Sequence, residues 1–273
     1  MIDNDIQLAL RAQFNPDGSN LRNLQLHLLD ILVEFDRICR KNNISYWLDS
    51  GTLLGAARHG GFIPWDDDLD VCVLKRDQKR LARAIKNDLQ EPFSFVDANS
   101  SKDYTRRWGR LYNNTVTVTR MAPDPKVKGG TMKREESIWL DIFFEANGVP
   151  AVSRKIDLFY GRCYRRRYSL IQDGWFRHVT GVLIYPLAEL TIAAARLFGR
   201  VFHRNSLIHD YGTGFYSQRF MNDVFPLSET EFEGHSFKVP FNTDHYLSVI
   251  YGKWDSIPDR KENHRLLDIV VKR

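Results

Sequence analysis

The sequence has few cysteines and no spacing that would pair them. Its 273 residues include three, which are Cys39, Cys72 and Cys163. Scattered thiols in odd number, with no CxxC pair, argue against a disulfide framework and against a cysteine-based zinc site. We therefore expect a protein of the reducing cytoplasm.

A secretory leader and a transmembrane run are also missing. The chain opens with the polar stretch MIDNDIQ, which is unlike the basic and then apolar start of a signal peptide. The longest apolar stretch, 179–202, is interrupted by Glu189, Arg196, Arg200 and Pro186. Because a spanning helix needs ~20 nearly uninterrupted apolar residues, we expect no membrane span.

Charge of one sign is not in large excess. The chain has 39 basic and 34 acidic residues, a formal net charge of +5, and 43% hydrophobic residues. This composition predicts an ordinary packed core. The mild positive charge favours anionic partners such as nucleotides, phosphorylated glycans or an anionic membrane face, without selecting one of them.

What the sequence does contain is a concentrated motif at residues 46–74, YWLDSGTLLGAARHGGFIPWDDDLDVCVL. The small-residue turn Gly51-Thr52 is followed by Asp68 and Asp70, which head an apolar run. In a strand these two carboxylates share a face. They repel each other unless a cation lies between them, and Mg²⁺ or Mn²⁺ takes such oxygen ligands together with substrate phosphates. We predict a metal-dependent site for phosphate chemistry.

A third acid lies in a second apolar strand, predicted at 137–144. Asp141 alternates there with large apolar side chains. A carboxylate in such a strand is costly to bury unless it is paired or binds a metal. We therefore predict Asp141 as the third metal ligand, or as the base on an acceptor hydroxyl. The alternative is a buried aspartate bonded to an arginine.

Candidate phosphate-binding residues surround these acids. Gly51 and Thr52 begin a short predicted helix whose amides can hold phosphate. Arg58 and His59 add charge at its other end, and Arg110 follows in a basic strand. The competing interpretation is that the glycines only permit a tight turn and that the arginines line a solvated edge strand.

Local patterns predict the elements around the motif. Apolar residues at three- and four-residue steps indicate a helix at 20–41, and Asp77 begins another that ends near Leu89. A hairpin is predicted within 106–119, with Asn113-Asn114 at its turn. A basic flexible loop is predicted at 123–134.

The composition changes after residue 150. A basic helix is predicted at 153–172, followed by the apolar stretch 179–202. Two interpretations compete for this stretch: an amphipathic helix on a membrane surface beside the basic helix, or an ordinary core helix.

The motif resembles the LicD family, which includes bacterial phosphocholine transferases and, in animals, fukutin and fukutin-related protein. The residues that carry the resemblance are Tyr46, Gly51-Thr52-Leu53-Leu54-Gly55, Arg58-His59, Gly61-Phe62-Ile63-Pro64-Trp65-Asp66-Asp67-Asp68 and Asp70. A weaker likeness extends over roughly residues 20–262. The resemblance adds Asp66 as a fourth acid of the site, and Asp67 is expected to point away.

The resemblance implies an α+β fold with a nucleotidyltransferase-like mixed sheet flanked by helices. We expect a catalytic core at 1–150 and a basic and apolar helical region at 151–205 for acceptor or membrane contact. The C-terminal part, 206–273, is expected to pack on the core.

The resemblance also implies the chemistry. Enzymes of this family move a phosphoalcohol from a CDP-activated donor to a sugar hydroxyl of a glycan. We expect phosphocholine from CDP-choline, transferred to a lipopolysaccharide, teichoic acid or lipid-linked precursor at the inner face of the plasma membrane. We expect choline rather than ribitol or glycerol only because choline is the more frequent alcohol in the family.

Two other classes of function stay open. A nucleotidyltransferase acting on RNA or protein would share the acids, but the chain lacks long glycine-rich and basic RNA-binding additions, so no nucleic-acid partner is expected. A non-catalytic membrane scaffold would use residues 154–203, but it does not explain why Asp68, Asp70 and Asp141 are present.

Overall fold

The centre of the protein is a mixed β-sheet. The computed structural model describes residues 2–101, 104, 106–123, 130–168, 175–258 and 266–271. Eight strands form the sheet in the order β1-β2-β5-β4-β10, with β3 beside β4, β6 beside β5 and β7 beside β6. β2 and β5 run parallel, and the other neighbours run antiparallel. The strands are β1 (Tyr46–Leu48), β2 (Asp70–Leu74), β3 (Phe93–Val96), β4 (Gly109–Pro123), β5 (Thr131–Asn147), β6 (Ser206–His209), β7 (Gln218–Phe220) and β10 (Leu266–Val271).

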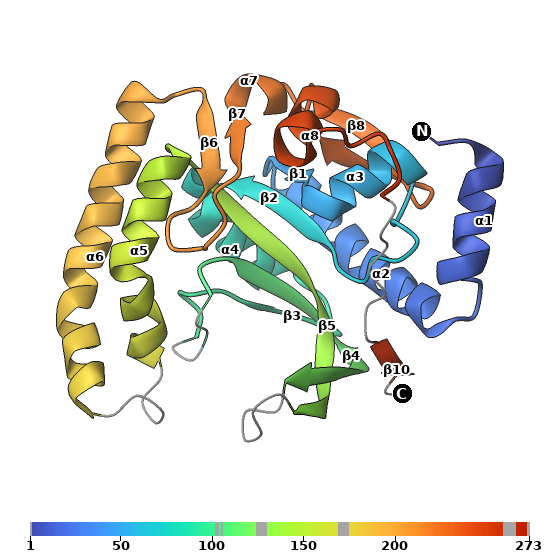
Figure 1. Cartoon of the computed structure of the whole chain (residues 1–273), viewed down its shortest axis with the longest axis horizontal. Helices are drawn as coiled ribbons and strands as arrows, with labels where there is room; N and C mark the ends of the chain where they lie inside the picture. Colours follow the sequence, from blue (N-terminus) through green and yellow to red (C-terminus); the bar gives the residue numbers. More distant parts are fainter. Residues whose placement is uncertain are drawn as a thin grey trace.

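Helices flank this sheet, so the predicted α+β class is confirmed (Figure 1). A separate hairpin is formed by β8 (Ser228–Phe232) and β9 (His235–Val239). Figure 1 shows α5 and α6 side by side at one end of the molecule and α1 at the other. The helices are α1 (Asn4–Phe14), α2 (Asn20–Lys41), α3 (Ser50–His59), α4 (Gln78–Asp88), α5 (Pro150–Tyr168), α6 (Trp175–Phe202), α7 (Met221–Val224) and α8 (Thr243–Tyr251).

α2 is the main helix of the core, and it has the predicted bounds. The Ser19 hydroxyl accepts a hydrogen bond from the Arg22 amide at 3.2 Å, which caps the first turn. The apolar residues on one face of α2 are fully buried against β4, β5 and β10: they are Leu24, Leu28, Ile31, Leu32, Phe35 and Ile38. Local periodicity and tertiary packing therefore agree here.

The predicted hairpin at 106–119 is wrong. Asn113 and Asn114 lie inside β4, which continues to Pro123 and pairs with β5. The register shifts between Asn113 and Thr117, and the Asn113 side chain accepts hydrogen bonds from the amide and hydroxyl of Thr115 at 3.0 and 2.7 Å. The asparagine pair thus accompanies a bulge, not a turn. Within the predicted loop 123–134, residues 131–134 belong to β5 and residues 124–129 lie outside the described part.

The chain leaves the sheet at α5 and returns to it after α6. β6 pairs with β5, and β7 pairs with β6, so the C-terminal segment completes the same sheet. Within the described residues, none of the helices is both long enough and apolar enough to cross a membrane. The division into units 1–150, 151–205 and 206–273 stays a prediction.

Candidate active site

The two predicted acids stand at the head of β2, tied to the small-residue turn. Asp68 is exposed, Leu69 is buried, and Asp70 begins the strand. The Asp70 amide donates to the Thr52 hydroxyl oxygen at 2.8 Å, and the Asp49 amide donates to the Asp70 carbonyl at 3.1 Å. These two bonds hold the start of α3 against the acidic strand.

Gly51 has a steric reason to be glycine. A Cβ atom at this position would lie 2.7 Å from Oδ2 of Asp66, which is closer than side-chain atoms approach without displacement. The absent side chain therefore lets the Asp66 carboxylate lie over the start of α3. The structure thus brings Asp66, the fourth acid that the family resemblance adds, to the Gly51-Thr52 turn.

Three consecutive acids form a group that can hold a metal. Asp66, Asp67 and Asp68 each offer a carboxylate oxygen, and these oxygens lie within 4.8 Å of one another. Asp67 is buried and forms an ion pair with Arg120 of β4. The positive charge of this arginine offsets the negative charge of Asp67. Asp68 is exposed and Asp66 is half-buried.

The negative charge of the site converges on Asp70. Burial, and then the charges of Asp68, Asp141, Asp49 and Asp66, raise the pKa of Asp70 well above its ordinary value. A cation among these carboxylates would offset their mutual repulsion. Because the donors at this end of β2 are carboxylate oxygens, they fit a hard ion such as Mg²⁺ or Mn²⁺.

Asp141 lies beside Asp70 in the register of the parallel strands β2 and β5. Its Oδ1 accepts from Nε1 of Trp108 at 2.6 Å and from Nε of Arg110 at 2.7 Å. Its Oδ2 accepts from Nε1 of Trp139 at 3.0 Å and from Nη2 of Arg110 at 3.5 Å. The arginine-bonded alternative is therefore what the structure contains. Each oxygen of Asp141 therefore accepts two hydrogen bonds, which fills the four or so lone-pair sites of a carboxylate.

The remaining predicted residues have partners inside the protein. Arg58 donates to the carbonyls of Trp254 and Ser256 at 3.1 and 2.9 Å and to Nε2 of His59 at 3.0 Å. Burial, with the charge of Arg58, lowers the pKa of His59 to about 3, so this imidazole is neutral. Both residues lie in the last turn of α3, at the opposite end from Gly51. Their binding to phosphate stays a prediction, as does that of Arg110.

The sequence-based prediction missed a buried ionic network behind the acids. Asp49, fully buried, accepts from Arg219 at 2.8 Å and from the Tyr246 hydroxyl at 2.6 Å. Glu145 lies 2.7 Å from Nδ1 of His209, and Arg219 also contacts Nε2 of His209 at 2.9 Å. Burial opposes the charged form of Asp49, but Arg219 and His209 hold its pKa below the ordinary value.

This network also bears on metal binding. Asp49, Cys72 and His209 form a second group with metal-capable spacing, but the Arg219 guanidinium already lies between Asp49 and His209. The network therefore holds Asp49, the residue after β1, in a fixed position. Asp49, like Asp141, is an acid next to an apolar strand, so the same argument would have predicted that it needs a partner. The sequence near Asp49 does not indicate which residue that is, because Arg219 is 170 residues away.

An aromatic wall stands next to Asp141. The ring of Phe143 lies 5.4 Å from Trp108 and 5.5 Å from Phe215, measured between centroids. The Arg106 guanidinium lies 5.0 Å from the Trp108 ring, and Arg110 lies 3.9 Å from the Trp139 ring. Aromatic faces in this part of the site therefore already accept cations.

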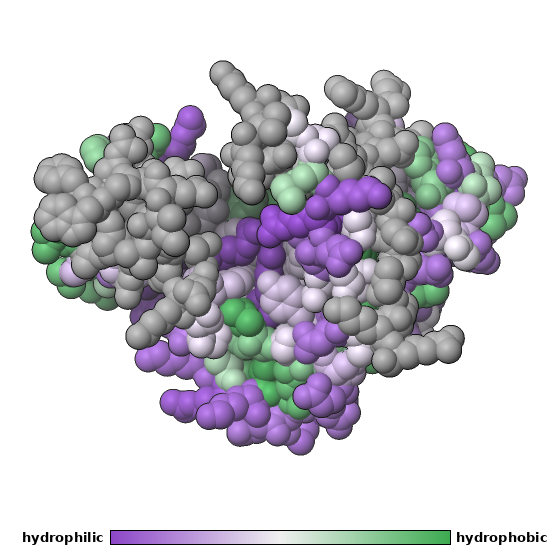
Figure 2. Space-filling model, turned by 90° about the horizontal axis from the view of Figure 1, so that it is seen from below, coloured by the Kyte–Doolittle hydropathy of each residue, from purple (hydrophilic) through white to green (hydrophobic). Residues whose placement is uncertain are grey.

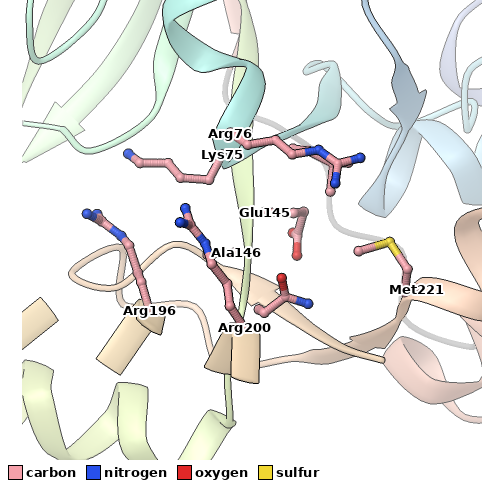
Figure 3. A pocket seen from close by; sticks show the side chains of 9 residues that line it. Lys75, Arg76, Glu145, Ala146, Arg196, Arg200 and Met221 are labelled. Atoms are coloured by element: carbon pink, nitrogen blue, oxygen red, sulfur yellow. The ribbon is translucent and has the colours of Figure 1, made fainter. Parts of the chain in front are cut away.

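A basic cavity of about 340 Å³ lies at the other end of β2. Figure 3 shows the guanidinium groups of Arg196 and Arg200 pointing toward Lys75 across it, with Arg76 also at its edge. Asp210 is fully buried and binds both Lys75 and Arg196, at 2.7 and 2.6 Å. This cavity is separated from Asp70 by the length of β2, and no sequence motif predicted it.

Comparisons with known proteins cover the part of the chain that contains these acids. A family model described as LicD/FKTN/FKRP, nucleotidyltransferase domain, matches residues 43–191. The lipopolysaccharide cholinephosphotransferase LicD of Haemophilus influenzae is 26% identical over 268 residues, which cover 89% of this chain and 96% of the relative. The human ribitol 5-phosphate transferase FKRP is 56% identical over 34 residues, which cover 12% of this chain and 7% of the relative.

Proposed function

The chain belongs to the LicD/FKTN/FKRP family, and on that premise we propose that it transfers a phosphoalcohol from a nucleotide-activated donor to a hydroxyl group of a glycan. The observation that carries the proposal is the placement of acids at the Gly51-Thr52 turn: Asp66 Oδ2 lies beside Gly51 and near Asp68, and the Asp70 amide is bonded to Thr52. The names of the Haemophilus and human relatives, a cholinephosphotransferase and a ribitol 5-phosphate transferase, support the same class of reaction.

The donor in this proposal is a CDP-alcohol whose phosphates lie at the start of α3. Because Thr52 Oγ1 accepts from the Asp70 amide, its own O–H is left to donate to a phosphate oxygen. Amides in the first turn of a helix also favour phosphate. Asp66, Asp68 and Asp70 would hold the divalent ion, which supplies charge neutralisation at the transferred phosphoryl group.

The transfer itself exchanges one P–O bond for another. The acceptor hydroxyl oxygen bonds to the phosphorus of the phosphoalcohol, the bond from that phosphorus to CMP breaks, and the hydroxyl proton passes to a carboxylate. Asp141 would take this proton or contact the ion through Oδ2, in place of the 3.5 Å contact between that oxygen and Nη2 of Arg110. Arg110 and Trp108 fix its other oxygen, so we assign both as positioning residues for Asp141.

The aromatic wall favours choline as the transferred alcohol. A trimethylammonium group binds over aromatic rings, and Trp108, Phe143 and Phe215 lie within 5.9 Å of one another, measured between centroids, beside Asp141. A polyol would instead need hydrogen-bond partners. Ribitol phosphate stays the second candidate because one relative is named for that transfer.

Binding calorimetry of the full chain with Mn²⁺ tests this proposal, with CDP-choline, CDP-ribitol, CDP-glycerol and CTP as ligands. Phe215→Leu should weaken CDP-choline roughly fivefold, which corresponds to ~1 kcal/mol of cation–π attraction, and leave CTP unchanged. Phe241→Leu is the matched control, because Phe241 is exposed and lies outside the wall. Tighter binding of CDP-ribitol than of CDP-choline would assign the polyol reaction.

Two results would replace the proposal altogether. Consumption of CTP or ATP with a nucleotide appearing on a macromolecule would assign a nucleotidyltransferase. Absence of binding to every CDP-alcohol would leave the non-catalytic scaffold.

A further inference from the structure

Helix α6 presents an apolar stripe to the outside of the molecule. Among its described side chains, large hydrophobic residues are exposed at three-, four- and seven-residue steps: they are Leu183, Leu187, Leu190, Leu197 and Val201, with exposed fractions from 49% to 72%. In the described part of α6 between 183 and 202, the buried positions are Ala188, Ile192 and Gly199. An ordinary core helix would bury this stripe, so that interpretation of the stretch 179–202 is wrong.

The apolar surface continues onto α5. Leu158 and Phe159 are 73% and 78% exposed. An open groove of about 610 Å³ runs between the helices, where Val152, Ile156 and Phe159 face Ala194, Ala195 and Phe198. Figure 2 shows hydrophobic side chains at the left margin of the molecule, the side on which α5 and α6 lie in Figure 1.

The positive charge of the chain is concentrated on the same two helices. By sequence, α5 and α6 contain nine basic and two acidic residues, whereas the rest of the chain contains 30 basic and 32 acidic residues. The whole net charge of +5 therefore arises from this helix pair, at +7, against −2 elsewhere. Such a distribution attracts an extended anionic surface.

Both acids of the pair are engaged by the rest of the protein. Asp157 accepts from the amides of Gly212 and Gly214 at 3.0 and 3.1 Å and from the Tyr216 hydroxyl at 2.9 Å. Glu189 accepts from Arg107 at 2.8 Å. Arg154 and Lys155, by contrast, are exposed on α5 beside the apolar surface. The outward charge of the described side chains is therefore positive.

We propose that α5 and α6 bind the surface of an anionic phospholipid bilayer. Exposed leucine and phenylalanine side chains would enter the boundary between headgroups and acyl chains, while basic residues contact lipid phosphates. The described helices cannot cross a membrane, so the contact is interfacial. A symmetric contact with a second copy fits less well, because it would bring two positively charged faces together.

Flotation of the full chain with vesicles tests this inference. Binding to equimolar phosphatidylglycerol–phosphatidylcholine vesicles should exceed binding to pure phosphatidylcholine vesicles, and added salt should weaken it. Leu190→Ser should reduce binding roughly tenfold, because a leucine contributes by burial of its apolar surface. Leu8→Ser is the matched control, since Leu8 is 65% exposed on α1 and Leu190 is 68% exposed on α6.

A second pair of variants tests how much the basic residues of α5 contribute to vesicle binding. Arg154→Gln with Lys155→Gln should weaken binding to the anionic vesicles about 30-fold, at ~1 kcal/mol for each basic residue near the surface. Arg83→Gln with Lys86→Gln, exposed on α4, should leave binding unchanged. These are surface positions, and matching thermal unfolding curves would verify that each variant is folded.

The inference fails if the chain does not float with the anionic vesicles. It fails as well if each test variant, Leu190→Ser and the double variant on α5, weakens binding no more than its own control. It also fails if the wild type is a dimer in solution that Leu190→Ser dissociates, because the stripe would then be an interface between copies. The inference does not depend on the proposed reaction: Asp70→Asn should bind vesicles like the wild type even if it binds no donor.

Discussion

Gly51→Ala isolates the contact that brings Asp66 to the start of α3. The new Cβ would lie 2.7 Å from Asp66 Oδ2, so the carboxylate must move by several tenths of an ångström or more. Displacement of a reacting group by about 1 Å can lower a rate about 100-fold, and we expect a loss of that order in transfer activity. Stability should change little, because alanine is favoured over glycine in a helix by ~1 kcal/mol, which offsets the strain.

A double-mutant cycle with Asp66→Ala tests the reasoning. When the carboxylate is absent, the added methyl group meets no obstacle. Gly51→Ala in that background should therefore cost no further activity and should raise the free energy of unfolding by ~1 kcal/mol. Transfer rates and urea unfolding would be measured for all four proteins. An equal loss of activity in both backgrounds would refute the idea that Gly51 acts through Asp66.

Three further predictions concern stability, and urea unfolding measures each of them. Arg219→Met should lower the free energy of unfolding by about 3–5 kcal/mol, because it removes the guanidinium that pairs with Asp49 and lies near Glu145 in the buried network. Arg40→Met, at an exposed ion pair, should cost less than ~1 kcal/mol, and equal costs would contradict this. Burial alone would raise the pKa of Asp210, but Lys75 and Arg196 lower it to about 2. The charged carboxylate of Asp210 therefore stabilises the fold by ~2 kcal/mol at pH values above the pKa of aspartate in the unfolded chain. This contribution is lost as the pH falls from about 4 to 2. Asp210→Asn should flatten that part of the pH dependence, and an unchanged slope would count against the ion pairs. Leu28→Ala, fully buried in the core, should cost about 2–5 kcal/mol, whereas Leu26→Ala, 43% exposed on the same helix, should cost less than ~1 kcal/mol.

Features set by neighbouring residues were predictable from the sequence. The bounds of α2 follow from the spacing of its leucines and from Ser19, and the strand that begins at Asp70 follows from the apolar run after it. The pairing of Asp141 with an arginine was foreseen as an alternative, because an acid in an apolar strand needs a partner; which arginine it would be was not.

Features set by distant residues were not predictable in this way. Asn113 and Asn114 carry a turn signal, but pairing with β5 on both sides of them keeps the strand continuous. Arg58 is a residue type that commonly binds phosphate, yet its guanidinium donates hydrogen bonds to the carbonyls of residues 254 and 256, far along the chain. The apolar pattern of α6 could not distinguish a buried helix from an exposed one, since periodicity does not say what covers a face.

The most direct test of the proposed site is the effect of Asp70→Asn on metal-dependent donor binding. Calorimetry with CDP-choline would compare the wild type, Asp70→Asn and the control Asp30→Asn, whose side chain is 63% exposed on α2, in Mn²⁺ and in EDTA. We predict that the wild type and Asp30→Asn bind only in Mn²⁺ and that Asp70→Asn loses about 100-fold in affinity. Equal binding by all three proteins, or binding that persists in EDTA, would contradict a metal site built on these acids.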